Sequence, residues 1–122
     1  MPRYVFVLIG EPDHYDNWDA SSEDQQQQVF DHFRAFTEAV RKRGNLVAGE
    51  ALDRPSSAFT ARRDSQPRLV TDGPFTETSE QICGFYVADL PNEASARELV
   101  LLLPAGYSVE VRHCPDVGVT PR

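Results

Sequence analysis

RYVFVLI, residues 3–9, is the stretch that decides the fold of this 122-residue chain. Its β-branched and aromatic residues are typical of a strand, and the glycine and proline within residues 10–12 end that strand. Both alternating sets of its side chains are apolar, as are those of a second strand-like stretch, ICGFYVAD, at residues 82–89. Strands of this kind need cover on both faces of their sheet.

Signals for helices and further strands surround these two stretches. After a polar loop at residues 13–19, Ser21 or Ser22 caps a helix whose apolar residues recur from Val29 at spacings of four, three and four, and Gly44 ends it. The other expected elements are a short strand at 46–52, a hairpin of 58–63 and 68–71, a second helix after the cap Asn92, and a last strand at 107–113. The order β-α-β-β(β)-α-β predicts an α+β protein, a ferredoxin-like sandwich with an antiparallel sheet and two helices on one face.

The amino-acid composition limits the classes of binding partner and the cellular compartment that we expect for this chain. With 40% apolar and 25% charged residues, the chain is expected to form one domain over residues 1–122, with a tail at 115–122. A net charge of -7 disfavours nucleic acid and anionic membranes as partners. The apolar runs are far shorter than the roughly 20 residues of a membrane span, and no signal peptide is recognisable, so we expect a cytoplasmic protein. Cys83 and Cys114 are expected to be free, mostly buried thiols, and neither a metal site nor a cofactor is expected.

The two strands that are apolar on both faces also predict an assembly. Two helices can cover one face of the sheet, which leaves the second apolar face open. A second copy of the chain is the simplest cover for that face. We therefore expect a homodimer that packs sheet to sheet, with a small-molecule ligand as the other candidate partner.

His32 and Asp72 are the candidate catalytic residues. His32 follows Val29 by three residues and precedes Phe36 by four, so it is expected on the flank of the apolar helix face, pointing toward the sheet. An imidazole there can act as a general acid or base if a carboxylate orients it, or it can be a half-buried packing residue. Asp72 opens the rigid turn DGPF, residues 72–75, where its carboxylate either accepts backbone hydrogen bonds or orients His32.

The candidate substrate-binding residues are Arg62, Glu77, Trp18 and Ser79. An arginine such as Arg62 can clamp a substrate carboxylate, and Glu77 can act beside it, although such residues are more often solvated ion pairs. Trp18 and its neighbour Tyr15 can line the mouth of a pocket or simply hold the loop to the fold.

The stretch VTDGPFTETSEQICGFY, residues 70–86, resembles the YCII-related family, in the subgroup named for its Asp-Gly-Pro-Phe motif. The resemblance continues over most of the chain, for example in VAGE at residues 47–50 and SVEVR at 108–112. It implies a ferredoxin-like fold of the dimeric α/β-barrel type, a dimer, and an active-site pair of histidine and aspartate. The chain departs from the family pattern at Ser79, where lysine is usual, and at Cys83, where glycine is usual.

Two functions are therefore expected as alternatives. The first is a cofactor-free lyase or isomerase that moves a proton on a small oxygenated or aromatic molecule, with His32 as base and Asp72 as its orienting partner. One relative in the family is similar to a dehydrochlorinase of a chlorinated hydroxyquinol, which agrees with that chemistry. The second is a non-catalytic dimeric module that binds a small ligand or serves as a regulatory accessory, since members of the subgroup are encoded beside sigma factors. The first requires that the two side chains share a cavity.

Overall fold

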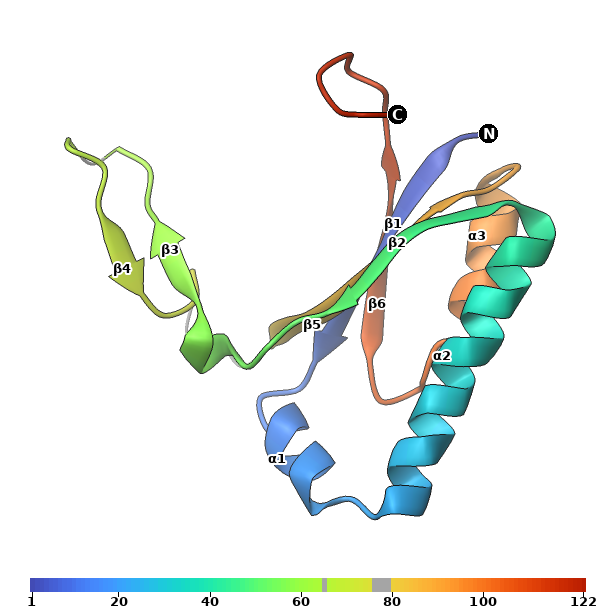
Figure 1. The fold of residues 1–122 in the computed structure, drawn as a ribbon, viewed down its shortest axis with the longest axis horizontal. Coiled ribbons are helices and arrows are strands. Elements are labelled where there is room, and N and C mark those ends of the chain that lie inside the picture. Colours follow the sequence, from blue (N-terminus) through green and yellow to red (C-terminus); the bar gives the residue numbers. More distant parts are fainter. Residues whose placement is uncertain (65, 76–79) are drawn as a thin grey trace.

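The computed structural model describes residues 1–64, 66–75 and 80–122, which form an α+β sandwich (Figure 1). The elements in chain order are β1 (Arg3–Gly10), α1 (His14–Ala20), α2 (Glu23–Arg43), β2 (Asn45–Ala51), the short 3-10 helix η1 (Pro55–Ser57), β3 (Phe59–Ala61), β4 (Val70–Asp72), β5 (Gln81–Asp89), α3 (Glu93–Val100) and β6 (Ser108–Cys114). The ferredoxin-like α+β fold expected from the sequence is confirmed.

The main sheet has the strand order β2-β5-β1-β6, and each neighbouring pair is antiparallel. The two strands with apolar residues on both faces, β1 and β5, are thus the two central ones. Across the sheet, Phe6 of β1 lies opposite Tyr86 of β5 and Val111 of β6. Helices α2 and α3 cover one face of the sheet, as Figure 1 shows, and the other face is called the open face below.

The core lies between the covered face and the two helices. Alternate residues of β1, namely Tyr4, Phe6 and Leu8, are buried there, while the intervening ones are only partly buried on the open face. The rings of Phe6 and Phe36 are both fully buried and meet edge to face, with their centroids 5.1 Å apart. This alternation shows that a single chain covers one of the two apolar faces of β1.

Helix α2 begins and ends where the sequence predicts. Ser22, rather than Ser21, is the cap: its hydroxyl accepts a hydrogen bond from the Gln25 amide, and the Gln25 side chain accepts one from the Ser22 amide. At the other end, a Cβ on Gly44 would lie 1.9 Å from the carbonyl oxygen of Asp89. Only glycine therefore lets the helix end so close to β5.

The prediction of a loop at residues 13–19 is wrong, because a short helix, α1, forms there. It has seven residues and none of them is fully buried. A helix of that length is unstable by itself in water, so contacts with the rest of the fold must hold it. Its aromatic side chains provide these contacts, as described below, and their effect cannot be read from local sequence.

The expected hairpin is confirmed but stands apart from the main sheet. Within the described part of the chain, strands β3 and β4 form a two-stranded sheet of their own, and Figure 1 shows them projecting away from the body, on the side of the sheet opposite α2. Residues 58–75, with residue 65 outside the described part, are called the arm below. The turn after β4 contains Gly73 with a φ of +103°, a conformation that favours glycine, as its sequence position indicates.

Both cysteines are free thiols, and Cys83 is buried whereas Cys114 is only partly so. Within the described ranges, no helix combines the length and the apolar character needed to cross a membrane.

Candidate functional site

The structure places His32 on the exposed side of α2, and the expectation that it points toward the sheet is wrong. Helical spacing relates His32 correctly to Phe36, which is buried. The N-terminal half of α2, however, extends beyond the ends of the strands in Figure 1, and the fully buried residues of this helix are Phe36 and Val40, in its second half. The sheet is therefore not there to cover His32.

Asp72 is also exposed, at the end of β4 in the arm. Figure 1 shows the arm and α2 on opposite sides of the sheet, and no hydrogen bond or ion pair joins Asp72 to His32, both of which are described residues. A catalytic role for the two residues stays a prediction, without a shared cavity to support it.

The four candidate substrate-binding residues are scattered. Arg62 lies exposed on the arm, where its guanidinium donates to the Phe75 carbonyl oxygen at 3.2 Å and stands 5.5 Å from the centre of that ring. Glu77 and Ser79 lie outside the described residues. Trp18 lies on α1 and lines a cavity, which is one of the two roles that the sequence left open for it.

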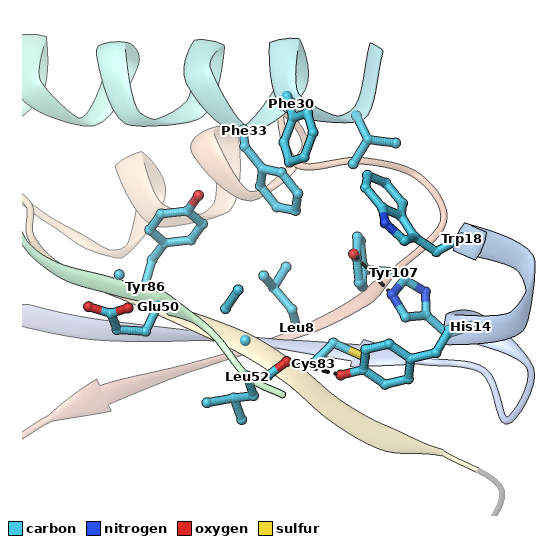
Figure 2. A pocket seen from close by; sticks show the side chains of 15 residues that line it. Leu8, His14, Trp18, Phe30, Phe33, Glu50, Leu52, Cys83, Tyr86 and Tyr107 are labelled. Atoms are coloured by element: carbon cyan, nitrogen blue, oxygen red, sulfur yellow. Dashed lines mark hydrogen bonds between the residues drawn. The ribbon is translucent and has the colours of Figure 1, made fainter. Parts of the chain in front are cut away.

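This cavity, called the aromatic pocket below, has a volume of about 480 Å³. It lies between α1, the N-terminal half of α2 and the ends of the strands (Figure 2). Apolar and aromatic side chains dominate its lining: Leu8, His14, Tyr15, Trp18, Val29, Phe30, Phe33, Gly49, Glu50, Ala51, Leu52, Cys83, Gly84, Tyr86 and Tyr107. Such a cavity has the size and character of a small-molecule site.

The aromatic rings come from elements that are distant in sequence. Phe33 of α2 lies 6.1 Å from the ring of Tyr86 and 5.8 Å from that of Tyr107, while Trp18 meets Phe30 edge to face at 5.4 Å. Gly49 of β2 makes room for one of these rings, because a Cβ there would lie 2.5 Å from the Tyr86 side chain. The pocket therefore offers flat aromatic walls to a ligand.

His14 brings a titratable group to the pocket. Its Nε2 lies 3.2 Å from the hydroxyl of Tyr107, drawn as a dashed line in Figure 2, and the two rings are 4.8 Å apart. Close approach depends on Gly10, because a Cβ there would lie 2.7 Å from Sγ of Cys83 and 2.9 Å from Cγ of His14. The end of β1 thus lets α1 pack directly against β5.

Burial sets the protonation states of these groups. Burial lowers the pKa of His14 below its usual value, although the charge of Asp13 opposes this change. Burial also raises the pKa of Tyr107 to about 12, which keeps its hydroxyl protonated at neutral pH. The pKa of the Cys83 thiol is likewise raised by burial, so Cys83 is a weak nucleophile. At neutral pH the pocket therefore presents a neutral imidazole beside a protonated phenol.

The lowered pKa of His14 predicts a pH-dependent stability. The unfolded chain binds the proton of this histidine more readily than the folded one, so the free energy of unfolding falls as the pH drops below the ordinary histidine value of about 6.5. The loss is complete once the pH is below the folded pKa. Thermal melts of the wild type and of His14→Gln between about pH 5 and pH 8 measure it. The wild type should lose more stability than the variant, and equal losses would contradict the prediction.

Helix α1 is fastened to the chain that leaves β2. Both carboxylate oxygens of Asp19 accept from the Arg54 guanidinium, at 2.8 and 2.6 Å, and the same guanidinium stands 5.2 Å from the centre of the Tyr15 ring. The Tyr15 hydroxyl donates to the carbonyl oxygen of Leu52 at 3.3 Å. Arg54 and Tyr15 therefore hold the helix that carries His14 and Trp18.

Sequence reasoning missed the residues at the centre of this pocket, above all His14, Tyr107 and Tyr86. One signal was available for His14, since it comes four residues after the end of a buried strand, where a side chain is readily carried to the edge of a sheet. Tyr107 is 93 residues away from His14 along the chain, and no local pattern connects the two.

A metal centre finds no support in the part of the chain that the structure describes, where no group of three or more His, Cys, Asp or Glu side chains is placed to hold an ion. The side chains with polar groups in the pocket lining are one imidazole, one thiol, three phenols, the indole of Trp18 and the carboxylate of Glu50.

Comparison with known proteins agrees with the fold. The model of the YCII-related domain matches residues 3–113. An uncharacterized protein of Rhizobium meliloti (strain 1021) is 34% identical over 97 residues, which are 76% of this chain and 78% of that protein. The match to the domain model includes every strand of the main sheet except the last residue of β6, and all three helices. The chain therefore belongs to the YCII-related domain family.

Proposed function

We propose that this protein is a cofactor-free enzyme that binds a small aromatic or oxygenated molecule in the aromatic pocket and moves a proton on it. The observation that carries the proposal is the contact between His14 Nε2 and the Tyr107 hydroxyl at the wall of an apolar cavity. The reaction class, a lyase or an isomerase, is that expected from the sequence, but the base is His14 instead of His32.

The neutral imidazole of His14 is suited to take a proton, because lowering its pKa keeps it unprotonated at neutral pH. In the forward step, a C–H or O–H bond of the ligand breaks and its proton reaches Nε2, directly or through the Tyr107 hydroxyl, which passes on its own proton in exchange. The bonding electrons stay on the ligand. An isomerase returns the proton to another ligand atom, whereas a lyase gives it to the leaving group.

The lining of the pocket supports a flat, small ligand. Ring walls from Phe33, Tyr86 and Trp18 favour an aromatic or conjugated molecule, and the volume of about 480 Å³ lies toward the lower end of the range of ligand pockets. Hydroxyl groups on the ligand can exchange hydrogen bonds with Tyr107 and His14.

We also propose that the chain belongs to the subgroup of the family named for the Asp-Gly-Pro-Phe motif, because it carries this motif at residues 72–75.

Ligand binding can be followed through Trp18, which is the only tryptophan of the chain and lines the pocket. Titration with phenol, catechol and cyclohexanol as probes should give a saturable change in tryptophan fluorescence for the two aromatic compounds. Phe33→Leu removes one ring wall and should weaken binding by up to about tenfold, since an aromatic contact contributes about 0.5–1.5 kcal/mol.

Val70→Thr, a variant on the distant arm, is the matched control and should bind as the wild type does. An equal, non-saturating response of wild type and Phe33→Leu to all three probes would refute the pocket as a ligand site. Saturable binding without any proton exchange into the ligand would instead favour the non-catalytic module, the alternative expected from the sequence.

We further propose that two copies assemble through the open face of the sheet. This face presents Val5 and Val7 of β1 opposite Val87 and Phe85 of β5, and none of the four is fully buried. A contiguous apolar strip on two central strands is typical of a subunit interface. The molar mass in solution tests this assembly.

A further inference from the structure

The arm presents an apolar face that stays exposed among the residues that the structure describes. In its two-stranded register, Phe59 lies opposite Asp72 and Ala61 lies opposite Val70, so these four residues share one face, on which three are apolar and Asp72 at the end of β4 is charged. The side chains of Phe59 and Val70 are 73% and 63% exposed. The other face carries Thr60, whose hydroxyl donates to the carbonyl oxygen of Gly73 at 2.9 Å.

An isolated hairpin with an exposed apolar face lacks the packing that normally stabilises two paired strands. Two strands alone are marginally stable in water, and they normally need a third strand or a packed face. Within residues 1–64, 66–75 and 80–122, the arm pairs with no strand of the main sheet, and neither Phe59 nor Val70 belongs to the buried core. A covering surface would therefore stabilise the arm in the conformation described.

The open face of the sheet offers a surface of matching pattern. The register aligns Glu50, Phe85, Val7 and Glu110 in one row across β2, β5, β1 and β6. The two apolar residues lie on the central strands, and the two glutamates, both exposed, lie on the edge strands. This row, called the acidic row below, is an apolar strip with a carboxylate at each end.

The charge of the arm is complementary to that of the acidic row. Residues 58–75 contain three arginines, Arg62, Arg63 and Arg68, and two aspartates, whereas the rest of the chain has nine basic and seventeen acidic residues. All three arginines are exposed. Each arginine comes within two residues of Ala61 or Val70 in the sequence. On the acidic row, Glu50 is the cross-strand partner of Phe85, and Glu110 is that of Val7.

We propose that the arm of each copy packs its apolar face on the acidic row of a second copy, with the arm arginines beside Glu50 and Glu110. The arm projects on the side of the sheet opposite the helices, which is also the side of the open face (Figure 1). A reciprocal exchange of arms is the symmetric arrangement that a two-fold dimer requires. This inference rests on the dimer proposed above. Because Glu50 of the acidic row also lines the aromatic pocket, the test variants below change only Glu110 and the arm.

The first test removes the apolar contact. Phe59→Ser combined with Val70→Ser should raise the dissociation constant of the dimer at least about tenfold, because two apolar anchors lose their cover. Light scattering after size-exclusion chromatography, over a range of protein concentrations, measures this constant. Thr71→Ser on the opposite face of the arm is the matched control and should leave it unchanged. If the double variant does not fold, the dissociation constant of Val70→Thr is measured instead, because this single substitution keeps a β-branched residue in the strand.

The second test reverses charge on the acidic row. Glu110→Lys should weaken the dimer about three- to tenfold and make it less sensitive to salt, since a rim charge that attracts the arm is replaced by one that repels it. Glu38→Lys makes the same change on an exposed position of α2, away from the open face, and should have no effect.

The outcomes separate the inference from the proposals on which it depends. A wild-type dimer whose dissociation constant is unchanged by both Phe59→Ser/Val70→Ser and Glu110→Lys would overturn the role of the arm while leaving the dimer intact. A wild-type monomer at every concentration would overturn the arm exchange and the dimer together. Binding of phenol at Trp18 would stand in either case, because it tests the pocket alone.

Discussion

Replacing His14 by glutamine should abolish most of the proton-transfer activity, lowering the rate by about 10²- to 10⁴-fold. The amide keeps a polar group of similar size beside Tyr107 but cannot accept and release a proton at neutral pH. Exchange of deuterium from solvent into a bound ligand, followed by NMR, measures this activity without knowledge of the final product. Because the pKa of His14 is lowered by burial, the wild-type rate should stay high as the pH falls to about 6.5 and drop only below that value.

His32→Gln is the matched control for this experiment. His32 is exposed on α2 and is not among the residues that line the aromatic pocket, so its loss should leave the exchange rate unchanged. A rate that falls with His32→Gln and not with His14→Gln would restore the pair of His32 and Asp72 and reject the site proposed above. Equal binding and no exchange in wild type and both variants would reject catalysis altogether.

Replacing Phe36 by alanine should cost about 3–5 kcal/mol in the free energy of unfolding. Phe36 is fully buried, and its ring lies 5.1 Å from that of Phe6 and 4.9 Å from that of Tyr86. A cavity left there removes contacts on both sides of the sandwich. Since small domains are stable by about 5–15 kcal/mol, the change takes a large part of the total. Urea unfolding of the variant and the wild type measures it.

Phe30→Ala makes the same substitution on the same helix, six residues before Phe36, where the side chain is 49% exposed at the rim of the pocket. It should cost well under half as much, about 1 kcal/mol, because it leaves no closed cavity. Equal costs for the two variants would show that α2 does not pack as described.

The central strands and the ends of α2 could be predicted because their signals are local. A run of β-branched and aromatic residues at residues 3–9 indicates a strand whatever surrounds it, and Ser22 with Gln25 closes a capping box within one turn of helix. The hairpin of the arm is equally local, since its two strands are separated by a short turn-rich stretch.

The error over His32 has a specific cause. Helical periodicity gives the direction of a side chain around the helix axis, and His32 does share a flank with Phe36. It does not reveal how far the sheet extends beneath the helix. The strands end before the N-terminal half of α2, so that half covers the aromatic pocket and leaves His32 exposed (Figure 1).

The sequence by itself thus determined the ferredoxin-like order of strands and helices and the apolar character of both faces of β1 and β5. Hydrophobic periodicity and capping act over a few residues, which is why they can be read directly. Only the tertiary structure decided that α1 is a helix and that His14 meets Tyr107, 93 residues away. The contacts that create this pocket join α1, α2, β2, β5 and β6, and their energies come from packing between segments whose proximity no local pattern encodes.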